Sequence, residues 1–118
     1  GGTTTVDGKI DASAPTKGDG GFIETSGDKI KIKDSAIITT KSAIDKNGTW
    51  LIDPTDFTIG ANGDMTGTLL SSLLGGGNIT ISSVSGAKEG KGDINVNDAV
   101  SWSSDSVLTL IAQHQLLQ

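Results

Sequence analysis

The stretch "GNITI" at residues 77–81 recurs as "GDINV" at residues 92–96, 15 residues further along the chain. Its rhythm continues in "VLTLI" at residues 107–111. Each copy alternates branched apolar residues with polar ones, as a half-buried strand does. Self-similar strands at a short spacing, with Gly and Asn at the corners, predict a β-solenoid in which each coil stacks its Ile or Val on the preceding coil.

Short segments of the same kind fill most of the chain, separated by clusters of Gly, Asn, Asp and Ser. They predict strands at residues 6–12, 21–27, 29–34, 36–40, 49–53, 57–60, 78–83, 93–102 and 107–112. The leucines of "TGTLLSSLLGGG" at 66–77 lie on one helical face, which predicts one short helix near residues 66–75, over an open end or side of the stack. An antiparallel β-sandwich is the alternative, because the two Asn-Gly pairs also suit hairpin turns.

The composition narrows the class of protein. The chain has 118 residues, enough for one domain with a modest core, and it contains 17 Gly but no Tyr and no Cys. Its net charge of -5 and the lack of a basic cluster argue against nucleic-acid binding. No apolar run approaches the roughly 20 residues of a membrane helix, so membrane insertion is not expected. Disulfides and thiolate metal sites are excluded because Cys is absent.

Large side chains gather in "GTWLIDPTDFTIG", residues 48–60. The pattern predicts a strand, a corner and a second strand. Alternation places Trp50 opposite Leu51, so we expect Trp50 and Phe57 to fill the core. Trp102 is expected to pack in the core or against an end of the stack, although an exposed indole could also stack on a sugar.

Two carboxylates and a proline form the corner of this segment. We interpret Asp53 as the cap of a turn ahead of Pro54, and Asp56 as bonding its own backbone in an Asx-turn. An acid–base pair of a β-helix polysaccharide-active enzyme is the first alternative, and a scissile Asp-Pro bond is the second. The chain has no Arg, and its one His lies far along the chain, at position 114. We therefore predict no catalytic residue here.

Other chemical motifs are weak or missing. The tandem repeat of calcium-binding β-rolls, EF-hand spacing and a phosphate-binding loop are all absent, so no metal ligand and no cofactor is expected. Two sequons, Asn47-Gly48-Thr49 and Asn78-Ile79-Thr80, make Asn47 and Asn78 candidate N-glycosylation sites.

Four segments taken in order resemble a block of very large secreted exoproteins, the filamentous-haemagglutinin-like adhesins of two-partner secretion, a group that includes haem-utilisation exoproteins. The segments are "GGFIETSG" at 20–27, "GTWLIDPTDFTIG" at 48–60, "TGTLLSSLLGGGNITI" at 66–81 and "GDINVNDAVSW" at 92–102. The resemblance runs from about residue 6 to residue 112. It implies a right-handed parallel β-helix fibre, exported through an outer-membrane partner transporter and displayed on, or released from, a Gram-negative cell surface.

We therefore expect residues 1–118 to form one all-β solenoid domain of a much longer secreted fibre, with an irregular tail at 113–118. The expected function is non-enzymatic: a structural or adhesive segment that contacts host cells, matrix or glycans through a receptor that the sequence does not name. A passive stalk that presents a toxin or a receptor-binding tip, and the polysaccharide-active enzyme, are the alternatives. Self-association through an exposed strand edge is also expected, because four leucines in "VLTLIAQHQLL" have no evident partner: Leu108, Leu110, Leu116 and Leu117.

Overall fold

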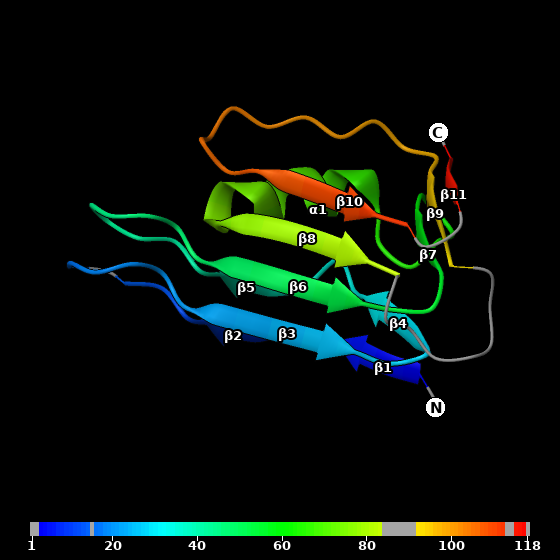
Figure 1. Ribbon diagram of the computed structural model, residues 1–118, viewed down its shortest axis with the longest axis horizontal. Coiled ribbons are helices and arrows are strands. Elements are labelled where there is room, and N and C mark those ends of the chain that lie inside the picture. The colour runs from blue at the N-terminus through cyan, green and yellow to red at the C-terminus, as the bar shows by residue number, and fades with distance from the viewer. Residues whose placement is uncertain (1–2, 15, 84–91, 113–114, 118) are drawn as a thin grey trace.

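The computed structural model describes residues 3–14, 16–83, 92–112 and 115–117, the last of these for its backbone. The chain winds into stacked coils of short strands with one helix against them, as Figure 1 shows. Every described strand pair is parallel. The predicted parallel β-solenoid is therefore confirmed, and the antiparallel sandwich is wrong.

The elements follow one another at short intervals. In chain order they are β1 Thr3–Val6, β2 Lys9–Asp11, β3 Phe22–Ser26, β4 Lys29–Ile32, β5 Ile37–Thr39, β6 Thr49–Asp53, β7 Phe57–Ile59, α1 Gly67–Leu73, the 3-10 turn η1 Leu74–Gly76, β8 Asn78–Ser82, β9 Asp93–Val96, β10 Leu108–Ile111 and β11 Gln115–Leu117. The four sheets have the orders β1-β4, β2-β5, β7-β9-β11 and β3-β6-β8-β10. We call the last of these the front sheet.

The length of one coil can be read from the front sheet. Residues at positions 23, 50, 79 and 108 pair in one column, so a coil takes 27 to 29 residues here. The 15-residue repeat seen in the sequence is therefore shorter than one coil. Its two copies become β8 and β9, which lie in different sheets. The 15-residue spacing is the distance from one face of a coil to the next face of the same coil. The two segments look alike because a strand on either face alternates inward apolar and outward polar residues.

Inward-facing branched side chains fill the interior. Alternate residues of β6 and β8 are buried. Their inward side chains form two columns, in which Trp50 stacks on Ile79 and Ile52 stacks on Ile81. Phe57 and Ile59 of β7 are also fully buried. The predicted core positions of Trp50 and Phe57 are thus confirmed, since every second strand residue must point inward in a coil of this width.

The short helix takes the place of a strand. Thr66 caps it, its hydroxyl accepting the Leu69 N–H at 3.1 Å, and its leucines turn into the core. Where the chain leaves η1, the Gly76 carbonyl accepts the Thr40 N–H at 2.8 Å, next to β5. In Figure 1, α1 lies behind β8. The helix predicted near 66–75 therefore covers the side of the stack, in the layer above β2 and β5.

Two expected segments differ from the structure. The strand predicted at 93–102 ends at Val96, because the chain then turns across α1, where the Asp98 carboxylate accepts the Gly67 N–H at 2.9 Å. The tail predicted to be irregular contains a strand, β11, paired with β9. The open edge of β9 offers this strand a hydrogen-bonding partner. Residues 113, 114 and 118 of that tail lie outside the described residues.

Candidate functional sites on the solenoid

At the predicted corner, the Asp56 carboxylate binds the backbone of another coil. Asp56 accepts the N–H of Asp93, 37 residues away, at 3.0 Å, and so ties the corner to the next coil. The sequence had suggested a bond from Asp56 to its own backbone; the bond to Asp93 is a longer-range one. Asp53 pairs in register with Ser26 at the end of β6, and Pro54 behind it is buried. This corner is a structural junction between coils.

Both candidate glycosylation sites belong to a polar network that joins coils. Asn78 donates from Nδ2 to the Asn47 carbonyl at 3.3 Å and accepts the Val107 N–H on Oδ1 at 2.9 Å. Asn47 donates from Nδ2 to the Asp105 carboxylate at 3.2 Å and accepts the Ser42 N–H at 2.9 Å. A glycan on either amide nitrogen would replace a hydrogen of a group that already connects one coil to another.

A projecting arm leaves the solenoid beside the front sheet. It consists of residues 12–14, 16–20 and 40–48, which we call the arm. The first part connects β2 to β3 and the second connects β5 to β6, so two consecutive coils bulge at the same place. In Figure 1 the two loops run side by side, away from the sheets, at the end opposite to both termini.

Hydrogen bonds hold the two loops of the arm together. The backbone links are Ala12 N to Thr39 O at 2.8 Å, Ala14 N to Lys41 O at 2.8 Å, Ala43 N to Ala14 O at 2.9 Å and Gly20 N to Lys46 O at 2.9 Å. Two aspartate side chains also link the loops: Asp45 accepts the Gly18 N–H at 2.8 Å, and Asp19 accepts the Lys46 N–H at 3.1 Å. The arm is thus ordered by polar contacts instead of an apolar core.

The surface of the arm is amphipathic. Ile44 is 71% exposed, more than any other large apolar residue in the described part of the chain. Lys17, Lys41 and Lys46 are exposed around it. The arm therefore presents three ammonium groups, Ile44 and two exposed carboxylates, each of which also accepts a backbone N–H group.

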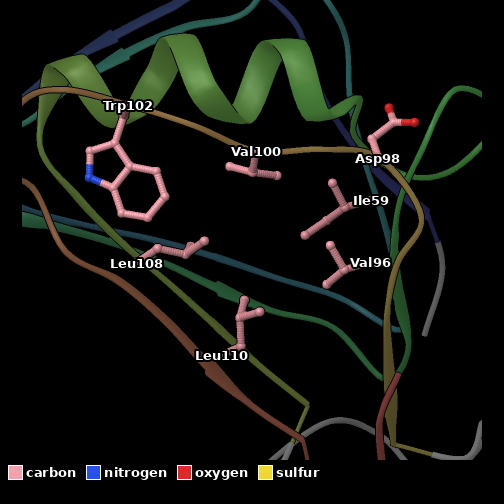
Figure 2. A pocket seen from close by; sticks show the side chains of 7 residues that line it. All are labelled: Ile59, Val96, Asp98, Val100, Trp102, Leu108 and Leu110. Atoms are coloured by element: carbon pink, nitrogen blue, oxygen red, sulfur yellow. The ribbon is translucent and has the colours of Figure 1, made fainter. Parts of the chain in front are cut away.

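A cavity of about 400 Å³ lies at the C-terminal end of the stack. Figure 2 shows six apolar side chains converging on it, with Asp98 at its rim; the apolar residues are Ile59, Val96, Val100, Trp102, Leu108 and Leu110. Trp102 is 39% exposed, and its indole N–H donates to the Ser106 carbonyl at 2.9 Å. Of the two positions expected for Trp102, the core and an end of the stack, the structure therefore shows the end.

The sequence did not single out the arm, although one signal was present. Two segments of similar length, "APTKGDG" at 14–20 and "KSAIDKNG" at 41–48, each follow a predicted strand and precede another. Loops of similar length in consecutive coils indicate that the loops stack on one face. Among the described residues, no group of three or more acidic or histidine side chains could hold a metal ion.

No protein-family model, no curated protein and no solved structure matches this chain. Within the described residues, none of the helical segments has the length and apolar character needed to cross a membrane.

Proposed function

We propose that this chain is a non-enzymatic structural and adhesive segment of a secreted bacterial exoprotein, and that the arm is its adhesive surface. The observation that carries the proposal is the arm itself, a protrusion held by bonds between residues of two coils. Repeat proteins place their insertions on one face, which is often the binding face. A surface ordered before binding loses little conformational entropy on contact.

Three features support the proposal of a secreted adhesive segment. The four segments that resemble two-partner-secretion adhesins imply export through an outer-membrane transporter to a Gram-negative surface. Apart from the cavity at its C-terminal end, the interior of the described stack is filled by apolar side chains, so most of the surface open to a ligand is on the outside. The exposed lysines and Ile44 suit a partner with anionic groups and apolar patches, as acidic glycans and matrix proteins have.

Binding of the immobilised chain to a panel of glycans and matrix proteins tests this function. Ile44→Ser removes the apolar side chain at the surface of the arm, whereas Ile37→Ser changes an isoleucine on β5 that is also exposed, at 55%. We expect at least one partner to bind, with a loss of about tenfold or more for Ile44→Ser and none for Ile37→Ser.

Other results of this binding test would support one of the alternative functions or another binding surface. Binding to no partner would favour a passive stalk. Binding that both variants retain would move the adhesive surface away from the arm. Release of new reducing ends from a polysaccharide would favour the enzyme.

A further inference from the structure

The chain contains two Asn-Gly pairs, and the structure places them in different surroundings. Asn47-Gly48 lies at the base of the arm, whereas Asn62-Gly63 lies in the loop that connects β7 to α1. An asparagine followed by glycine is chemically labile, because the next backbone nitrogen can attack the side-chain amide and glycine has no Cβ to hinder the approach. Which pair reacts therefore depends on how tightly each is held.

Three hydrogen bonds hold the groups of Asn47-Gly48 that would react. The Asn47 side chain accepts the Ser42 N–H on Oδ1 at 2.9 Å and donates from Nδ2 to the Asp105 carboxylate at 3.2 Å. The Gly48 N–H, whose nitrogen would attack, donates to the Thr40 carbonyl at 2.7 Å. The side chain cannot rotate toward this nitrogen until these bonds open.

Asn62-Gly63 is held by a single bond of this kind. The Asn62 side chain is exposed and makes no hydrogen bond within the described part of the chain. The Gly63 N–H donates to the Gly60 carbonyl at 3.0 Å, which closes a four-residue turn. A turn at the surface opens at a small cost in free energy compared with the paired strands. The Asn62 amide is therefore free to approach the Gly63 nitrogen each time the turn opens.

Water also reaches this pair. Asn62 and Gly63 line a hollow of about 330 Å³, together with Lys31, Lys33 and Asp64. The hollow lies on the side of the stack, between the end of β4 and the loop after β7. It admits the water molecule that the second step of the reaction consumes.

We propose that Asn62 is a site of spontaneous deamidation, and that the fold protects Asn47 from the same reaction. The Gly63 nitrogen bonds to Cγ of Asn62, and ammonia leaves with the proton that this nitrogen loses. Water then opens the five-membered succinimide at either carbonyl, which gives aspartate or isoaspartate. The reaction needs no oxidant and no enzyme.

The modification would change the surface of the protein with time. A carboxylate at position 62 takes the net charge from -5 to -6 and places a negative group in the hollow beside Lys31 and Lys33. Isoaspartate also lengthens the main chain of the loop by one carbon. The inference goes beyond adhesion and concerns a loop outside the arm, so its failure would leave the proposed adhesive function untouched.

Incubation of the folded chain at mildly alkaline pH, followed by peptide mass spectrometry, tests the proposal. Fragment spectra should place the change from amide to carboxylate at residue 62. Endoproteinase Asp-N distinguishes the products, because it cleaves before aspartate and not before isoaspartate. We expect residue 62 to react at least about tenfold faster than residue 47, since two more hydrogen bonds restrain the reacting groups of Asn47.

Three controls separate the fold from the local sequence. In concentrated guanidinium chloride both Asn-Gly pairs lose their contacts, so the two rates should become similar. Asp105→Ala removes one bond of the Asn47 amide, and it should speed the reaction at residue 47 and leave the rate at residue 62 unchanged. Asn62→Ser removes the reacting amide, so the change at this position should disappear.

Two results would overturn the proposal. One is a folded chain in which residue 47 reacts as fast as residue 62. The other is a reaction at residue 62 that occurs only in guanidinium chloride, because the loop would then protect this asparagine. An unchanged circular dichroism spectrum of Asp105→Ala shows that a faster reaction at residue 47 is not a loss of the fold.

Discussion

Trp50 stabilises the centre of the stack in two ways. Its side chain is 1% exposed, within a column of branched residues, and its indole N–H donates to the Thr25 hydroxyl at 3.0 Å in the coil below. A buried indole needs such a partner, because an unpaired N–H away from water costs about 1–3 kcal/mol. The Trp102 indole N–H also has a partner, the Ser106 carbonyl, but this side chain lies at the end of the stack and is 39% exposed.

Alanine substitutions should separate these two environments. Trp50→Ala is expected to lower the free energy of unfolding by about 3–5 kcal/mol, because it leaves a large cavity between coils. Trp102→Ala should cost only about 1 kcal/mol, since the end of the stack already contains a cavity. Urea unfolding followed by circular dichroism measures both, and equal losses would contradict the assignment of one tryptophan to the core and the other to the end.

Asp11, the last residue of β2, tests the hydrogen bonds at the base of the arm. The Ser13 hydroxyl, and then the Ser13 backbone N–H, donate to Asp11 and hold the pKa of this carboxyl below its ordinary value of 3.8. A lowered pKa stabilises the fold at pH above 3.8, and this contribution is lost as the pH falls through the folded pKa. Ser13→Ala should raise the pKa of Asp11 toward 3.8 in an NMR titration. An unchanged pKa would show that the hydroxyl is not the main cause.

At the scale of an element, the arm depends on backbones that approach each other closely where it joins the sheet. A Cβ on Gly48 would lie 1.8 Å from the Gly21 carbonyl oxygen and 2.6 Å from the Gly20 carbonyl carbon. A Cβ on Gly20 would meet the Thr40 carbonyl oxygen at 1.7 Å. The two coils therefore contact each other directly through their backbones at this point, which only glycine permits.

Gly48→Ala should consequently destabilise the protein by about 3 kcal/mol, the upper end of what overpacking costs, because backbone atoms must move to make room. Gly75→Ala is the control, since a Cβ there meets nothing within 4 Å. Its effect should stay within about 0.5 kcal/mol. Thermal unfolding of the two variants measures the difference, and an equally stable Gly48→Ala would contradict the close approach.

The whole molecule is a one-dimensional stack, in which strands pair between neighbouring coils and the Asn47–Asp105 hydrogen bond spans two coils. Among the described strands, β6 and β8 have a neighbour on each side, whereas β3 and β10 have one on a single side. The outer strands can therefore open with the loss of one interface, and the inner strands only with the loss of two. Stability should decline from the middle of the front sheet toward both ends.

Hydrogen exchange should show this gradient. In dilute protein, amides of β6 and β8 should exchange at least about tenfold more slowly than those of β3 and β10, a difference of about 1.4 kcal/mol in the free energy of opening. Equal exchange in all four strands would mean that the stack opens as one unit.

Much of the fold was accessible from the sequence because strand alternation is local. Whether Trp50 or Leu51 points inward depends on a period of two residues, so the pattern predicted strands, buried faces and the helix near 66–75. The function proposed from the resemblance and the self-association expected from the strand edge stay predictions. Asp53 ends β6 and Asp56 precedes β7, with Pro54 between them, whereas the bond from Asp56 to Asp93 was not foreseen.

Tertiary structure alone decided which strands pair. A 15-residue spacing is compatible with one coil or with half of one, and only contacts across 27 to 29 residues distinguish them. The arm depends on bonds of the same range, such as Asp45 to the Gly18 N–H, and the strand at 115–117 depends on the open edge of β9. These contacts join residues far apart in the chain, so no window of the sequence contains them, whereas inward and outward positions are set by immediate neighbours.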